Sequence, residues 1–163
     1  MIPKLQSTAP PAAIAELCAT LQKDGRLNDS AAFYDAVMTR ELLSATSISP
    51  GWALPHARLK GLSQLSFALG RTFQPLVWFG ESKSRVQTIF LFAVPETEAK
   101  TYLNLIAAVA RLSQNAALLE QLQRARDEQG MFEILQQAPL RQPRPAATAN
   151  ENPTPRALGA AVN

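Results

Sequence analysis

Cysteine and histidine are each present only once in the 163 residues, as Cys18 and His56. A single thiol cannot form an internal disulfide, and one histidine with one distant cysteine is a poor ligand set for a metal ion. We therefore expect no internal disulfide, no metal and no cofactor, and the sequence disfavours a metal enzyme.

Long apolar runs are also missing. No uninterrupted apolar stretch approaches the roughly 20 residues that a helix needs to cross a bilayer. Lys4 is the first charge of an N-terminal segment that lacks the continuous apolar region of a signal peptide. These features predict a cytoplasmic protein with no membrane insertion, and the length favours one domain with a real core.

The chain has no large excess of charge of either sign. The formal net charge is +3, and +2 of it lies after residue 136, in Arg141, Arg144 and Arg156 against Glu151. The remainder is close to neutral and has no basic cluster with interleaved aromatic residues, so nucleic acid is not an expected partner. Five of the twelve prolines fall in Pro139–Asn163. We predict a domain over residues 10–137 and a disordered proline-rich tail over residues 138–163.

Helical periodicity appears on both sides of a strand-rich middle. Ile14, Leu17, Cys18 and Leu21 recur at helical spacing, and Asp29 or Ser30 suits the N-cap of a second helix. The predicted helices span Ala12–Lys23, about 30–43, Glu98–Gln114, Ala116–Arg124 and, after a break at Gly130, Met131–Gln137.

The middle of the chain predicts strands. Val86–Val94 ends in six consecutive apolar residues, which is typical of a central strand buried on both faces, and Pro95 stops it. Shorter strands are predicted at Trp52–Leu54, Leu65–Thr72 and Leu76–Phe79. Helices, strands and helices in this order, without a repeat, predict a single α/β domain with its sheet between helical layers.

His56 is the residue most suited to chemistry. A neutral imidazole is a nucleophile near pH 7, as a protein needs if it accepts a phosphoryl group on nitrogen. A lone histidine is more often a hydrogen-bonded structural residue than a catalytic one, so the surrounding residues must distinguish the two roles. We predict that His56 follows a short strand, after a loop of hydroxyls and backbone amides able to cradle an anion: Ser44, Thr46, Ser47, Ser49 and Gly51.

Arg40 is the second candidate. It follows Ala36 by four residues and Val37 by three, so the helical stripe of Phe33 and Val37 directs Arg40 inward. A partly buried guanidinium needs an anionic partner. Two interpretations stay open: a salt bridge with Asp35, Glu41 or another carboxylate, or contact with a phosphoryl group on His56.

The sequence resembles the EIIA proteins of the bacterial phosphotransferase system (PTS), in the fructose/mannitol/nitrogen-regulatory class. The resemblance rests on Thr39-Arg40-Glu41, the loop to Gly51, and Ala53-Leu54-Pro55-His56, and continues through Phe92–Pro95 and the following helix. It covers roughly residues 10–137. The resemblance implies a mixed sheet of about five strands flanked by helices.

The resemblance also implies a phosphoryl carrier. His56 would receive a phosphoryl group from HPr or its nitrogen-branch equivalent, with Arg40 stabilising the phosphate, and pass it to an EIIB cysteine or use it as a regulatory signal. If active, the protein is a phosphohistidine phosphotransferase component. Family members commonly carry a second histidine after the long strand, where Tyr102 and Asn104 stand here as possible substitutes.

The sequence is compatible with three functions. The first is a working phosphocarrier. The second is a regulatory module of the nitrogen type, whose binding to a kinase or transporter depends on the phosphorylation of His56. The third is a retained fold in which His56 is silent.

Overall fold

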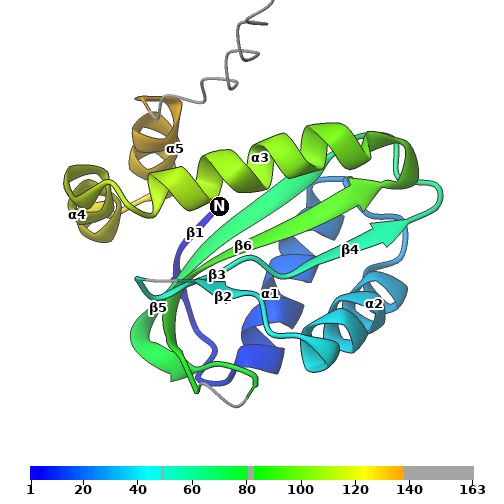
Figure 1. Cartoon of the computed structure of the whole chain (residues 1–163), viewed down its shortest axis with the longest axis horizontal. Coiled ribbons are helices and arrows are strands. Elements are labelled where there is room, and N and C mark those ends of the chain that lie inside the picture. Colours follow the sequence, from blue (N-terminus) through cyan, green and yellow to red (C-terminus); the bar gives the residue numbers. More distant parts are fainter. Residues whose placement is uncertain (49, 81–82, 138–163) are drawn as a thin grey trace, which may run out of the picture.

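The computed structural model describes residues 1–48, 50–80 and 83–137. The predicted tail over residues 138–163, and Ser49 of the predicted loop, lie outside the described residues. The described residues form a six-stranded mixed sheet with helices on both faces (Figure 1), so the predicted α/β architecture is confirmed.

The long strand β6 (Arg85–Pro95) is the centre of the sheet. On one side it pairs antiparallel with β5 (Ser66–Val77), whose other edge pairs parallel with β1 (Ile2–Leu5). On its other side it pairs parallel with β3 (Trp52–Ala53) and with β4 (His56–Leu59). The edge strand β2 (Ser47–Ile48) pairs antiparallel with β3. Because β6 is buried on both faces, its near-continuous apolar sequence was a reliable signal.

Two helices cover one face of the sheet (Figure 1). They are α1 (Pro10–Lys23) and α2 (Ser30–Leu43), which bury Leu17 and Phe33 in a core with Ile89 of β6. Proline at the start of α1 needs no backbone N–H there, and the Asp29 side chain caps α2 by accepting from the amide of Ala32 at 2.9 Å.

The opposite face is covered by the C-terminal helices. After a short 3-10 turn, η1 (Glu96–Glu98), come α3 (Ala99–Leu112), α4 (Ala116–Arg124) and α5 (Glu128–Gln137). Tyr102, Leu122 and Met131 from these helices share a second core with Phe90 and Phe92 of β6. None of the helices within the described residues combines the length and the apolar character that crossing a bilayer requires.

Three details of the predicted elements were wrong or incomplete. The strands predicted at Leu65–Thr72 and Leu76–Phe79 are one strand, β5, whose pairing with β6 is irregular between Arg71 and Leu76. Gly130 lies inside α5 rather than before it, because the Asp127 side chain accepts from its amide at 2.8 Å and starts the helix earlier. His56 follows the short strand β3, as predicted, but it also begins a further strand, β4, which was not predicted; residues 56–59 pair there with residues 92–95 of β6.

Candidate functional site

His56 is held at the start of β4 beside the most buried strand of the sheet. Its backbone lies opposite Phe92 of β6, and the preceding carbonyl of Pro55 accepts from the amide of Phe92 at 2.9 Å. Pro55 fixes its own φ and restricts Leu54 to extended conformations, so the chain enters β4 along a defined path. The imidazole is half-buried and reaches a surface pocket.

One imidazole nitrogen of His56 is occupied by the backbone. Nδ1 lies 3.0 Å from the carbonyl oxygen of Leu54. A carbonyl only accepts hydrogen bonds, so Nδ1 carries the proton in this contact and the lone pair of the neutral ring is on Nε2. The pKa of His56 is lowered from 6.5, chiefly by burial and further by Arg40 and Arg58, while the Leu54 hydrogen bond and Glu41 oppose the shift. A lowered pKa keeps the ring neutral at pH 7.

Arg40 lies next to His56. Together with Ala36, Ala57 and Arg58 the two residues line a pocket of about 390 Å³, which we call the His56 pocket. The Nη1 atom of Arg40 donates to the Ser44 carbonyl at 2.7 Å, which anchors the guanidinium near the end of α2. The ion pairs formed within the described residues join Met1 to Glu128 and Glu120 to Arg124, so the alternative of a salt bridge from Arg40 finds no support there.

Arg58 is a pocket residue that the sequence analysis did not identify. It stands two positions after His56 on β4, on the same side of the strand, and lines the same pocket. Its guanidinium carbon is 5.9 Å from the centroid of the Tyr102 ring. The alternation of side chains along a strand could have identified it, but only once His56 was known to begin a strand.

Tyr102 and Asn104, the two possible substitutes for a second histidine, differ in position. The Tyr102 ring is 5.1 Å from the His56 ring, centroid to centroid, and is buried. Burial raises the pKa of Tyr102 to about 12, against the opposing effect of Arg40 and Arg58, so its hydroxyl stays protonated. Asn104 is exposed and follows two residues later on α3, about 200° around the helix. Of these two residues, Tyr102 is therefore the one that contacts His56.

One residue of the predicted phosphate loop, Thr46, is hydrogen-bonded to a buried carboxylate, that of Glu41. Glu41 has no exposed surface, and its carboxylate accepts from the Thr46 amide at 2.7 Å, from the Thr46 hydroxyl at 2.8 Å and from the Trp78 indole at 2.6 Å. The Thr46 amide and hydroxyl are therefore engaged with Glu41 rather than directed into the His56 pocket. Glu41 ties the loop to α2, one residue after Arg40.

The later part of the loop runs away from His56. Ser47 belongs to β2, and the carbonyl of Gly51 accepts from the amides of Gln87 at 2.8 Å and Thr88 at 3.2 Å. These residues precede Phe92 by four or five positions, which is about 13–16 Å along β6. Gly51 has φ +74°, and a Cβ at this position would lie 3.2 Å from the Arg85 carbonyl oxygen, so glycine suits this turn sterically.

The comparison with known families identifies the chain. The family described as "Phosphoenolpyruvate-dependent sugar phosphotransferase system, EIIA 2" matches residues 2–138. The chain belongs to the PTS EIIA type 2 family. The match includes β1, which the sequence analysis did not predict, and it covers both His56 and Arg40.

Two relatives of this EIIA domain differ in how much of their own length the chain covers. The "Nitrogen regulatory protein" of Bradyrhizobium diazoefficiens is 27% identical over 135 residues, which cover 83% of this chain and 88% of that protein. The "PTS system fructose-specific EIIABC component" of Bacillus subtilis is 28% identical over 124 residues, covering 76% of this chain and 20% of that protein. The chain thus spans a fifth of the second relative and most of the first.

The fold is that of solved EIIA proteins. The crystal structure of nitrogen regulatory protein IIA-Ntr from Neisseria meningitidis superposes with a TM-score of 0.73, at 23% identity, over 81% of this chain and 90% of that one. At this identity the likeness concerns the fold alone.

Proposed function

We propose that this EIIA domain accepts a phosphoryl group on Nε2 of His56 from an HPr-like phosphocarrier. The observation that carries the proposal is the Nδ1 contact with the Leu54 carbonyl, which leaves Nε2 as the nucleophilic atom in a pocket shared with two guanidinium groups. The lowered pKa of His56 supports the neutral, nucleophilic ring at pH 7.

The transfer is a displacement at phosphorus. As the Nε2–P bond forms, the bond from phosphorus to the donor histidine breaks, and its electron pair returns to the donor nitrogen. The phosphorylated ring of His56, with a proton still on Nδ1, carries a positive charge that the Leu54 carbonyl stabilises. Arg40 and Arg58 stabilise the negative charge on the equatorial oxygens, and such electrostatic contacts are the main contribution that a protein makes to phosphoryl transfer.

The residues of the predicted phosphate loop affect the His56 pocket in different ways. The Ser44 carbonyl accepts a hydrogen bond from the Arg40 guanidinium and so acts on Arg40. Thr46 acts through its hydrogen bonds to Glu41. Ser47 and Gly51 belong to the rest of the predicted loop, and we propose that they contribute by setting the path of the chain toward β3. Ser49, the remaining loop residue of the prediction, lies outside the described residues. Tyr102 packs against the imidazole and orients it, without supplying the charge of a second histidine.

The onward step passes the phosphoryl group to a cysteine of an EIIB domain. The relative named as an EIIABC component supports this acceptor, because its name places EIIA with B and C parts in one protein. A thiolate attacks phosphorus, the S–P bond forms, the Nε2–P bond breaks, and His56 returns to the neutral ring.

Incubation with a phosphorylated HPr donor tests the proposal. Wild-type protein should gain one acid-labile, alkali-stable phosphate, and His56→Ala should gain none. Lys60→Gln serves as a matched control. Lys60 is exposed just after β4, so its substitution removes one charge without changing the pocket lining. Absence of label on folded wild-type protein would refute phosphoryl acceptance.

A second candidate function is regulation without efficient onward transfer. It is favoured by the relative named "Nitrogen regulatory protein", of which the chain spans 88%. In this case a kinase or transporter would bind one phosphorylation state of His56 preferentially. Affinity measurements with His56→Asp and His56→Ala against such a partner distinguish the two functions, and equal affinities would remove the support for regulation.

A further inference from the structure

A second pocket lies far from His56 along the sheet, where β1, β5 and β6 meet the end of α4. It has a volume of about 480 Å³, and its lining includes four cationic residues, Lys4, Arg71, Arg124 and Arg126, with no carboxylate among the described residues that form it. We call it the Arg71 pocket. Gln87 of β6 belongs to it and precedes Phe92, the residue opposite His56, by five positions, about 16 Å along the strand.

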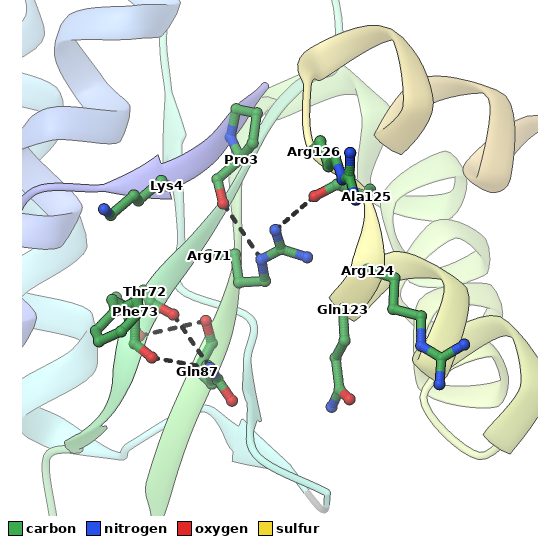
Figure 2. Close-up of a pocket in the computed structure, with 10 residues that line it drawn as sticks. All are labelled: Pro3, Lys4, Arg71, Thr72, Phe73, Gln87, Gln123, Arg124, Ala125 and Arg126. Carbon is green, nitrogen blue, oxygen red and sulfur yellow. Dashed lines mark hydrogen bonds between the residues drawn. The ribbon is translucent and has the colours of Figure 1, made fainter.

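Arg71 is the fixed element of this pocket. Figure 2 shows it in the middle, between Lys4 and Phe73 on one side and the end of α4 on the other. Its Nε donates to the Pro3 carbonyl at 3.2 Å, Nη2 donates to the Ala125 carbonyl at 2.7 Å, and Nη1 donates to the Leu122 carbonyl. Carbonyl oxygens hold the guanidinium in place but do not neutralise it, and two of its five N–H groups remain for another acceptor.

The rim adds cations whose charge is largely uncompensated. Lys4 extends its ammonium group to 5.4 Å from the centroid of the Phe73 ring, a contact that leaves its charge intact. Arg126 is exposed and forms no ion pair within the described part of the chain. Arg124 pairs with Glu120 at 2.6 Å, but both side chains are exposed, so the pair holds it weakly.

The carboxylates of neighbouring segments have partners outside the pocket lining, although Asp127 and Glu16, which accept from neutral groups, keep their negative charge. Glu128 pairs with the amino group of Met1 at 3.0 Å, and Asp127 accepts from the Gly130 amide at 2.8 Å. Glu16 accepts from the Ser7 hydroxyl at 2.8 Å and from the Gln6 amide. The Arg71 pocket is therefore a concave surface with several positive charges, although the domain as a whole is close to neutral.

From this geometry we infer that the Arg71 pocket binds a small phosphate ester. Several cations around one concavity favour an anion with more than one negative charge, and guanidinium groups match the oxygens of a phosphate. The volume lies within the range of about 300–1,000 Å³ usual for small-molecule sites. Phe73, which is 74% exposed, offers a ring face for the organic part of the ester, and the exposed Gln123 amide offers a donor and an acceptor.

Ligand binding at the Arg71 pocket does not depend on phosphoryl transfer at His56, so it can be tested separately. Titration calorimetry and amide NMR at low salt would use ADP, ribose 5-phosphate and citrate as probes, with wild-type protein and His56→Ala. We expect saturable binding of at least one phosphate ester below about 1 mM, weaker binding of citrate, and shifts at amides of residues 3–5, 71–73 and 123–126. Binding of ADP alone would assign a base-binding role to Phe73, and binding of both esters a role for the phosphate and sugar.

A charge-matched pair of variants tests the assignment. Lys4→Gln with Arg126→Gln should weaken binding about tenfold or more, whereas Lys23→Gln with Lys60→Gln, which removes the same charge from exposed positions elsewhere, should change it less than about twofold. The inference would be overturned by no saturable binding of either ester, by citrate binding as tightly as the esters, or by equal weakening in the two double variants. Shifts confined to residues around His56 would overturn it as well.

Discussion

The His56 pocket and the Arg71 pocket each contain a partly buried guanidinium, but the backbone uses the two groups differently. Arg40 makes one hydrogen bond to a carbonyl, that of Ser44 four residues later in the chain, and its charge faces an imidazole. Arg71 donates to three carbonyls from β1 and from the end of α4, elements that are distant in sequence. Arg40 is therefore free to act on a ligand, whereas Arg71 also joins three parts of the fold.

The two cationic pockets also differ in whether they contain a nucleophile. In the His56 pocket, the positive charges lie beside a neutral ring with an available lone pair, so they can stabilise charge that moves during a reaction. The Arg71 pocket has cations and amides but no such group among its described lining residues, so it is suited to binding alone. Replacing Arg40 or Arg71 by glutamine therefore tests the catalytic role and the binding role separately.

The largest effect is expected for Arg40→Gln. Loss of one charge beside His56 should slow phosphorylation by an HPr donor about a hundredfold, because a positioned group at a developing charge commonly contributes that much. The free energy of unfolding should fall by less than about 1 kcal/mol, since one hydrogen bond is lost. Rapid-quench labelling and urea unfolding measure the two quantities, and an unchanged labelling rate would remove Arg40 from the mechanism.

The reverse pattern is expected for Arg71→Gln. The free energy of unfolding should fall by about 2 kcal/mol, because an amide cannot replace three donors to the carbonyls of Pro3, Leu122 and Ala125. The labelling rate of the folded fraction should stay within about twofold of wild type, a difference of about 0.4 kcal/mol in the barrier. A large loss of labelling in folded protein would show that the two pockets are coupled.

A smaller loss of stability is expected for Glu41→Gln. The amide group keeps one oxygen to accept from Trp78, but it turns an acceptor toward Thr46 into a donor, so the free energy of unfolding should fall by about 1 kcal/mol. The labelling rate should also decrease, because the loop that holds Arg40 is loosened. Unfolding and labelling equal to wild type would show that the Glu41 network does not organise the pocket.

The smallest effect concerns pH. Because His56 is the only histidine, its ring protons can be followed without assignment in NMR. The midpoint should lie below 6.5, since burial lowers its pKa. The unfolded chain then binds a proton before the folded one, so this contribution to stability is complete above pH 6.5 and is lost as pH falls through that value toward the folded pKa. A midpoint above 6.5 would contradict the described environment.

The sequence predicted those parts of the fold that local signals determine. The apolar run of β6 and the bounds of α4 were confirmed, and of the two predicted cap residues of α2, Asp29 or Ser30, the cap is Asp29. Strand β1 was not predicted, because four residues containing Pro3 have little strand signal and become a strand through pairing with β5. The long β5 was divided in two at Gln74-Pro75, where the structure has an irregularity in the pairing instead of an end.

The candidate site was partly predictable for a similar reason. His56 and Arg40 were found from residue chemistry and helical spacing, and the structure brings them into one pocket. Arg58 required the position of β4, and the engagement of Thr46 by Glu41 required the approach of Trp78 from a distant segment. Arg71 has no local sequence signal, because its partners are backbone carbonyls 51 to 68 residues away.

The most direct test of the account identifies the nitrogen that carries phosphorus. Protein labelled with ¹⁵N, phosphorylated by an HPr donor, would be studied by long-range proton–nitrogen correlation with coupling to ³¹P. The contact between Nδ1 and the Leu54 carbonyl predicts phosphorus on Nε2 and a retained proton on Nδ1. Phosphorus on Nδ1, or on a residue other than His56, would contradict it.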